Sequence, residues 1–344
     1  MTTSNDSGPV VLVPSDRLLA ICLDPAAEAL AGRGFKVLRP AADAPRDWTD
    51  ELARTDVVVL TPRNRFGRAD IAAAPRLKGV VFPTIGVEAL DLDAATEAGL
   101  AVGFGATPEL IAGMAEANVL MIAAMLLDLP RKQRALTERG WRDGSVRARL
   151  VQGKTIGFVG FGRIARATLR RLDGWDIDAL YYDPHVGDTA VEGATRVADL
   201  VSLLRASDVV VLLVDQRPET IGMIGAAELA AMKHDACLVN AARGAVVDEA
   251  ALTRALAAGT LAGAALDAFA TEPLPADSPL RAFDNVLLTP HNLGHTVDQM
   301  TSFVHAVVDN VAAIARGAPP PFFKNPQVMP AWKTRLERLL APLH

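Results

Sequence analysis

The glycine-rich turn at residues 160–165 constrains the fold of this 344-residue chain more than any other feature. An apolar run that ends at Val159 precedes the turn, and a segment of helical composition follows at residues 164–172. A second apolar run, at residues 177–182, then ends on Asp183. A strand, a glycine turn, a helix and a strand in this order are typical of a βαβ unit that binds a dinucleotide.

Each part of this pattern has a physical reason. Gly160 permits the tight turn, Gly162 lets the backbone approach a pyrophosphate, and Ala165 is small enough for the helix to pack on the strand. The N-terminus of the helix offers N–H groups and a partial positive charge to the phosphates. Asp183 stands where a carboxylate accepts hydrogen bonds from a ribose diol and repels a 2′-phosphate, which favours NAD over NADP. The alternative is a tight glycine turn between buried elements. The residues expected to bind the cofactor here are Gly160, Phe161, Gly162, Arg163, Ile164 and Asp183.

The length and composition of the chain predict a two-domain protein without a nucleic-acid partner. Half of the residues are hydrophobic, the net charge is −5, and no stripe of lysine and arginine is visible. Cys22 and Cys237 match no metal or disulfide spacing, so we expect no metal and a reducing compartment. The first residues lack the features of a signal peptide, and the apolar run at 119–127 is too short to span a bilayer. We therefore expect a soluble, cytoplasmic protein with no membrane partner.

The rest of the chain alternates apolar and helix-like segments, which indicates parallel strands joined by crossover helices. Residues 108–129 read as one long helix that is apolar nearly all round and must be covered by a domain or subunit contact. A second long helix, at residues 297–317, would return the chain to the first unit. The predicted fold is α/β, with two doubly wound parallel-sheet domains, one flavodoxin-like and one Rossmann, joined by long helices. Residues 1–120 with 298–344 would form the first domain, and residues 121–297 the second.

Three polar side chains follow predicted strand ends in the second domain, where doubly wound sheets bind their ligands. Arg243 can hold a carboxylate and a carbonyl oxygen through its planar guanidinium. His291 can give or take the proton on that oxygen, and Glu272 can bind the other imidazole nitrogen and fix its orientation. Each residue alone is more often a surface ion pair or a helix cap. Together, after a nucleotide motif, they predict catalysis.

Four segments, at residues 153–165, 240–252, 265–275 and 285–296, resemble the D-isomer-specific 2-hydroxyacid dehydrogenases in sequence, order and spacing. The resemblance extends from about residue 57 to residue 325. It implies an NAD-dependent enzyme that transfers hydride reversibly between NADH and C2 of a small 2-oxoacid. It also implies a homodimer joined through the long helix, with the first domain binding substrate and the second binding NAD.

Carried over by position, the resemblance gives roles to single residues. Arg243 would bind substrate, His291 would be the acid/base and Glu272 its partner. Asp267 would face the nicotinamide carboxamide. The further cofactor contacts implied are Ala241, Ala242, His291 and Gly294, and the substrate contacts are Ile85, Gly86, Arg243 and Arg63.

Several positions depart from the pattern of the family and leave alternatives open. The loop at residues 84–89 is altered, Thr-Pro-Arg replaces the usual Arg-Ser-Arg at 61–63, and His295 stands where a small residue is common. We interpret these changes as an altered choice of substrate. A formate or phosphite dehydrogenase of the same fold is an alternative, although formate enzymes carry glutamine at the position of Glu272. A non-catalytic NAD(H)-sensing protein is another, and the lack of a basic face argues against it.

Overall fold

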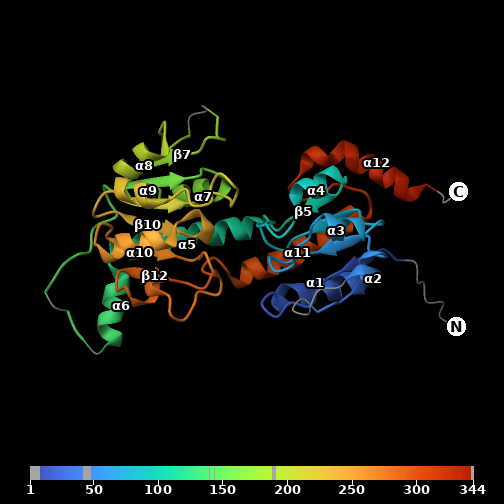
Figure 1. The fold of residues 1–344 in the computed structure, drawn as a ribbon, viewed down its shortest axis with the longest axis horizontal. Helices are drawn as coiled ribbons and strands as arrows, with labels where there is room; N and C mark the ends of the chain where they lie inside the picture. The colour runs from blue at the N-terminus through green and yellow to red at the C-terminus, as the bar shows by residue number, and fades with distance from the viewer. Residues whose placement is uncertain (1–7, 42–47, 139, 143, 188–190, 342–344) are drawn as a thin grey trace. The chain divides into compact units, whose positions relative to one another are not determined.

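The computed structural model describes residues 8–41, 48–138, 140–142, 144–187 and 191–341. The chain divides into two compact units, and Figure 1 shows the elements of each. Unit 1 comprises Met1–Leu110 and Thr296–His344, and unit 2 comprises Ile111–His295. The prediction that the chain has no signal peptide rests mostly on residues 1–7, which lie outside the described residues.

Unit 1 is built on a parallel sheet of the flavodoxin type. Its strands have the order β2-β1-β3-β4-β5, so that the direction of winding reverses between β1 and β3. β3 and β4 are buried along their whole length, which explains their continuous apolar sequence. The strands are β1 (Val10–Leu12), β2 (Lys36–Leu38), β3 (Val57–Val59), β4 (Gly79–Val81) and β5 (Ala101–Gly103).

The helices of unit 1 include the second long helix that the sequence predicts. It is α11, which packs on β3, β4 and β5 and against α1. Gly103 allows this approach, because a Cβ there would lie 3.0 Å from the side chain of Asn310. Trp332 closes the unit: it is fully buried and donates to the Lys78 carbonyl oxygen at 2.7 Å. The helices are α1 (Ala20–Gly32), α2 (Thr49–Leu52), α3 (Arg68–Ala72), α4 (Leu92–Glu97), α11 (Val297–Ala315) and α12 (Met329–Leu340), with a short 3₁₀ turn η3 (Pro326–Val328).

Unit 2 is a Rossmann unit with one additional strand. The order β12-β11-β10-β9-β6-β7-β8 places β6 beside β9, where the winding reverses. All pairings between its named strands are parallel, and together with unit 1 they confirm the predicted fold class. The strands are β6 (Thr155–Val159), β7 (Asp178–Tyr182), β8 (Thr195–Arg196), β9 (Val209–Leu212), β10 (Cys237–Asn240), β11 (Gly263–Leu266) and β12 (Val286–Leu288).

Helices cover both faces of the unit 2 sheet (Figure 1). Successive side chains of a strand point to opposite faces, so Val209 and Val211 of β9 join a core with α5 and α7. Val210 and Leu212 join a second core with α8, α9 and α10. The helices named are α5 (Pro108–Leu126), α7 (Arg163–Arg171), α8 (Leu200–Ala206), α9 (Ala226–Ala231) and α10 (Glu249–Ala257). Two 3₁₀ turns are η1 (Gly244–Val246) and η2 (Pro279–Ala282).

The long apolar helix is shorter than the sequence predicts. α5 ends at Leu126, because Asp128 adopts a left-handed conformation with φ 56°, and a separate helix, α6 (Leu129–Thr137), follows. By length and mean hydropathy, 1.6, α5 could cross a membrane, but 56% of it is buried inside the protein, as in the core helix of a soluble domain. Leu120 of α5 is nevertheless 51% exposed, so one part of the helix remains uncovered in the single chain.

Candidate active site

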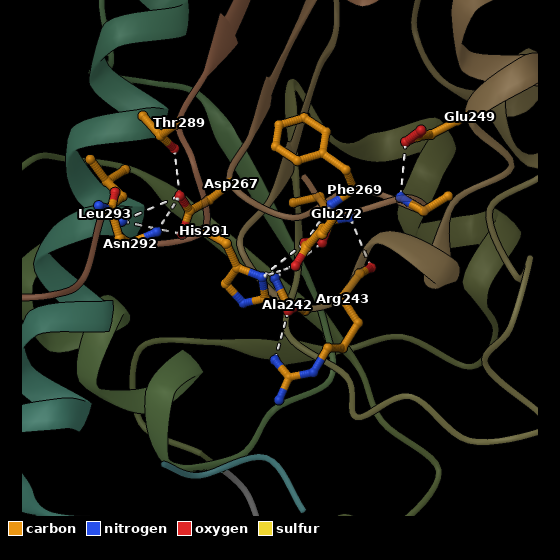
Figure 2. Close-up of polar contacts among 12 residues, drawn as sticks. Ala242, Arg243, Glu249, Asp267, Phe269, Glu272, Thr289, His291, Asn292 and Leu293 are labelled. Atoms are coloured by element: carbon orange, nitrogen blue, oxygen red, sulfur yellow. Dashed lines mark hydrogen bonds and ion pairs between the residues drawn. The ribbon is translucent and has the colours of Figure 1, made fainter. Parts of the chain in front are cut away.

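Three neighbouring strands of unit 2 deliver Arg243, Glu272 and His291 to one edge of the sheet (Figure 2). Arg243 follows β10, Glu272 lies in the loop after β11, and His291 lies in the loop after β12. Because these strands are adjacent and parallel, their carboxyl ends lie side by side. The structure therefore brings together the three residues for which the sequence predicts catalysis.

His291 and Glu272 form a direct pair. The imidazole Nδ1 lies 2.8 Å from both carboxylate oxygens, Oε1 and Oε2. Both side chains are partly open to solvent, His291 by 42% and Glu272 by 39%. His291 also has a positive φ of 54°, a conformation that is costly for a side chain of its size and is concentrated at functional sites. The pair fixes the ring so that Nε2 is the nitrogen turned away from the carboxylate.

The environment of Glu272 keeps its carboxylate ionised. Burial by itself would raise the pKa of Glu272, but two hydrogen bonds oppose it, from His291 and from the backbone N–H of Phe269, the latter at 3.0 Å. The positive charges of His291 and Arg243 act in the same direction, so the pKa of Glu272 lies below its ordinary value. At neutral pH His291 thus faces a full negative charge.

Replacing Glu272 by glutamine is expected to lower kcat for the 2-oxoacid reduction that the sequence predicts, by about tenfold or more. Glutamine keeps the size of the side chain but removes the carboxylate that lies 2.8 Å from His291 Nδ1 and orients the ring. Steady-state kinetics at saturating cofactor measure this kcat. Glu249→Gln is the matched control, because Glu249 accepts from Ala270 N–H at 3.0 Å in the same loop (Figure 2). A folded Glu272→Gln variant that keeps the wild-type kcat would argue against the role of the pair.

Arg243 is presented by a turn that Asn240 shapes. Asn240 is buried; its Oδ1 accepts from Ala242 N–H at 3.1 Å, and its Nδ2 donates to the Arg243 carbonyl oxygen at 3.0 Å. Gly244 then lies directly against the backbone of Phe269, with no room for a Cβ. The Arg243 Nη1 donates to the Ala242 carbonyl oxygen at 2.8 Å. Sequence reasoning missed Asn240, although its place beside Arg243 in the run Asn-Ala-Ala-Arg is a usable signal.

Asp267 anchors the loop that carries His291. Its side chain is buried, and Oδ1 accepts from Thr289 Oγ1 at 2.6 Å, from Asn292 N–H at 3.1 Å and from Leu293 N–H at 3.2 Å (Figure 2). These bonds hold the residues on both sides of His291. Sequence reasoning assigned Asp267 a contact with the nicotinamide and missed that it anchors the His291 loop. The position of an aspartate after a strand does not by itself reveal such hydrogen bonds.

The residues after the His291 loop return to the core of unit 2. Gly294 lies against Met114 of α5, where a Cβ would meet the sulfur at 2.3 Å, so this position needs glycine for packing. His295 is half-buried. Burial lowers the pKa of His295, the charge of His291 lowers it further, and Asp267 opposes both. Burial thus disfavours the charged form of His295, which adds bulk rather than charge near His291.

The glycine turn after β6 has the shape that a dinucleotide needs. Gly160 has φ 86°, and a Cβ there would lie 2.7 Å from the Leu213 carbonyl oxygen, so only glycine fits. A Cβ at Gly162 would instead point into open space, with nothing within 4 Å. Gly162 is also the N-cap of α7 and gives the helix no side-chain cap. The first turn of α7, which contains Arg163 and Ile164, can thus direct N–H groups at a phosphate placed over Gly162.

Asp183 closes the same turn from the end of β7. Its Oδ2 accepts from Phe161 N–H and its Oδ1 from His185 N–H, both at 2.8 Å. An ionised carboxylate has about four acceptor sites, so two remain for the hydroxyls of a ribose. The Phe161 side chain is fully buried and stacks on Tyr181 at 4.2 Å between ring centroids. Phe161 therefore supports the turn from the core and offers a ligand only its backbone. The residues present fit NAD.

The remaining predicted substrate residues belong to unit 1. Ile85 and Gly86 lie in the half-buried loop after β4, where the Thr84 hydroxyl donates to the Gly86 carbonyl oxygen at 3.3 Å. Arg63 follows β3, the strand next to β4, and forms an ion pair with Asp16. Ala241 and Ala242, by contrast, lie in unit 2 as buried residues just before Arg243.

Comparison with known proteins identifies similar sequences over most of the chain. Residues 119–292 match the family model "D-isomer specific 2-hydroxyacid dehydrogenase, NAD binding domain". A glyoxylate reductase of Thermofilum pendens is 33% identical over 315 residues, which cover 86% of this chain and 92% of that protein. A D-3-phosphoglycerate dehydrogenase of Archaeoglobus fulgidus is 33% identical over 270 residues, 78% of this chain, but the match spans only about half, 51%, of that relative. Among solved structures, an NAD-dependent formate dehydrogenase of Staphylococcus aureus in complex with NAD is 28% identical, with a TM-score of 0.75 over 89% of this chain and 94% of that one.

Proposed function

Because the chain belongs to the D-isomer-specific 2-hydroxyacid dehydrogenase family and is an NAD-dependent oxidoreductase of that family, we propose that it reduces a small 2-oxoacid reversibly, with His291 as the acid/base. The observation that carries this proposal is the His291–Glu272 pair, in which Nδ1 is held by a carboxylate at 2.8 Å. The pair holds the ring so that Nε2, turned away from the carboxylate, can face a reacting oxygen.

The chemistry divides between the cofactor and three side chains. Bound NADH supplies the hydride that reduces C2. His291 gives the proton on Nε2 to the carbonyl oxygen of the oxoacid, and Glu272 holds the ring in place before and after the transfer. Arg243 binds the carboxylate of the oxoacid through its planar guanidinium and stabilises the negative charge that develops on the carbonyl oxygen. In the reverse direction, His291 takes the proton from the hydroxyl of the 2-hydroxyacid.

A second candidate is the oxidation of a one-centre anion such as formate or phosphite, because a solved formate dehydrogenase has a similar structure. Glu272 separates the two, since the formate enzymes that this family resembles carry glutamine at that position. Purified protein should be assayed with NADH and a panel of 2-oxoacids, and with NAD⁺ and formate or phosphite. Turnover of oxoacids alone supports the proposal, and turnover of formate or phosphite alone supports the alternative.

Asp183 is expected to govern the choice of cofactor. Replacing it by serine removes the charged acceptor for the ribose hydroxyls, so the KM for NADH should rise by about tenfold or more. The KM for NADPH should fall or stay constant, because the carboxylate no longer repels a 2′-phosphate. Asp178→Ser is a suitable control, since Asp178 is an exposed acid at the opposite end of β7. Equal discrimination between the cofactors in wild type and Asp183→Ser would refute this role.

We also propose that the protein is a cytoplasmic homodimer, joined along α5, whose only other partner is its small-molecule substrate. Leu120 supports this assignment, because it is an exposed apolar side chain on a helix that is apolar over most of its length. Sedimentation should then give twice the chain mass of 36.4 kDa, and Leu120→Glu should return the mass to that of one chain. A wild-type protein that sediments as a monomer would contradict it.

A further inference from the structure

Unit 2 has a cavity at the edge of its sheet opposite the one that carries Arg243, Glu272 and His291. All of the residues that line the cavity belong to unit 2. Its volume is about 480 Å³, which is within the range of small-molecule sites. Part of the lining comes just before β10, β11 and β12, whereas Arg243, Glu272 and His291 follow the other ends of these three strands. A ligand in this cavity therefore binds away from the predicted cofactor and substrate residues of unit 2.

Two arginines that are mostly shielded from solvent line the cavity. The Arg131 side chain is 26% exposed; its Nε donates to Asp284 at 3.1 Å and its Nη1 to Asp128 at 3.0 Å. The Arg149 side chain is 24% exposed, and its Nη1 donates to Asp235 at 2.7 Å. The Nη2 of Arg131 and the Nε of Arg149 have no acceptor among the described residues. Both guanidinium groups thus keep N–H donors that a ligand can use.

The acids that pair with these arginines leave the cavity with an excess of shielded positive charge. The side chain of Asp284 is 57% exposed and that of Asp235 is 63% exposed. Exposed ion pairs contribute little free energy, because water and salt screen them, so an anion in the cavity can share or replace these partners. Arg147 also lines the cavity, and its partner in the described part of the chain is the Ser145 hydroxyl at 2.9 Å. Its charge is therefore not balanced by a described carboxylate.

The C-terminal ends of α5 and α10 also reach the cavity, and carbonyl groups at a helix C-terminus repel anions. At the end of α5, the Leu126 carbonyl oxygen accepts from Arg149 N–H and the Leu127 carbonyl oxygen accepts from Lys132 Nζ, both at 2.7 Å. At the end of α10, the carbonyl oxygens of residues 254–256 accept from the N–H groups of residues 258–260. These hydrogen bonds reduce the repulsion that the helix ends would exert on an anion.

Another part of the lining is apolar. Met125, Leu256 and Leu261 are buried, and so is the thiol of Cys237. Burial raises the pKa of Cys237 to about 11, so the thiol is uncharged at neutral pH and acts as an apolar surface. The cavity therefore combines guanidinium groups with apolar surface, as a site for an organic anion requires.

We propose that this cavity is a second ligand site, which binds a small organic anion. Arg131 and Arg149 bind the carboxylate or phosphate group of the ligand, because planar guanidinium groups match the geometry of both. The apolar lining contacts the rest of the molecule. The site does not depend on the proposed function, since none of the residues that line it takes part in that chemistry.

The test is calorimetric titration of the NADH-saturated protein with benzoate, which carries a carboxylate on an apolar ring, and with phenyl phosphate. At least one of these probes should bind with a Kd of about 1 mM or lower. Arg131→Gln and Arg149→Gln should each raise that Kd by about tenfold or more, since each removes a charge-assisted hydrogen-bond donor. Arg243→Ala should leave the Kd unchanged, because Arg243 lies at the opposite edge of the sheet. Arg254→Gln is the matched control, since Arg254 is an exposed arginine of α10 that does not line the cavity.

The two probes distinguish the two kinds of anion: tighter binding of phenyl phosphate assigns the site to phosphate esters, and tighter binding of benzoate assigns it to carboxylates. Ala257→Phe is a second test that leaves the arginines in place. Ala257 is exposed and lines the cavity at the end of α10, so a phenyl ring there should fill part of the space and weaken binding by about tenfold or more. If an arginine variant does not fold, as judged by thermal melting, Ala257→Phe decides.

Three results would overturn the proposal. The first is that neither probe binds wild type in a saturable way. The second is that the Kd stays at the wild-type value in the folded Arg131→Gln, Arg149→Gln and Ala257→Phe variants. The third is that binding is lost in Arg243→Ala, which would place the probes at the other edge of the sheet.

Discussion

Replacing His291 by alanine is expected to lower kcat for oxoacid reduction by about 10³-fold, within the range found for the loss of a general acid. The imidazole lies 2.8 Å from Glu272, which orients it. Glu272 itself is ionised at neutral pH and so has no proton to deliver in its place. The KM for NADH should rise far less than kcat falls, because His291 is one of several expected cofactor contacts and the glycine turn lies after β6, on a different strand. Steady-state kinetics at saturating NADH measure both quantities.

The control for this substitution is His305→Ala. His305 is an exposed histidine on α11 and takes no part in the proposed site, so its loss should leave kcat within about twofold of the wild-type value. Thermal melting of both variants separates loss of chemistry from loss of fold. A His291→Ala variant that keeps most of its kcat while folded would remove His291 from the mechanism.

Replacing Arg243 by alanine should reduce kcat/KM for the oxoacid by about 10³-fold, because one residue both binds the carboxylate and stabilises the developing charge. Unlike the loss of His291, this loss should appear in KM as well as in kcat. Arg243→Lys should recover only part of the activity, to a kcat/KM about 10²-fold below that of wild type. An ammonium group carries the positive charge of arginine but lacks its planar pair of hydrogen-bond donors.

Arg254→Ala is the corresponding control, because Arg254 is an exposed arginine on α10. The turn around Arg243 should survive replacement of Arg243 by alanine or lysine, since Asn240 bonds to backbone atoms of that turn. An Arg243→Ala variant whose KM for the oxoacid equals that of wild type would contradict a substrate-binding role.

The sequence predicts the fold well where its signal is local. Apolar runs that alternate with helix-like segments predict parallel strands and crossover helices, and the structure confirms two parallel sheets of this kind. The predicted end of the long apolar helix, at residue 129, was wrong. The sequence stays mostly apolar up to Leu129, but the backbone turns at Asp128 and α5 ends at Leu126. The two-residue strand β8 and the short helix α2 escaped prediction, since elements of that length carry too little periodicity.

The site is predictable only in part, because tertiary contacts decide what strand-end residues touch. Arg243, Glu272 and His291 each follow a predicted strand, which predicts that they lie at one edge of one sheet. The structure confirms that placement. The sequence did not reveal that Asp267 ties down the His291 loop. Nor did it pair Asp16 with Arg63, which are far apart in the chain and meet only because β1 and β3 are neighbours in the sheet.

The fate of the transferred hydride distinguishes a 2-oxoacid reductase from a protein that only binds NADH. Wild-type protein is incubated with NADH deuterated at the transferred position of C4 and with a 2-oxoacid that it turns over, and the product is analysed by mass spectrometry and NMR. We expect one deuterium at C2 of a D-2-hydroxyacid, formed in step with NADH oxidation and lost in His291→Ala. Tight binding of NADH without deuterated product from any 2-oxoacid would contradict it.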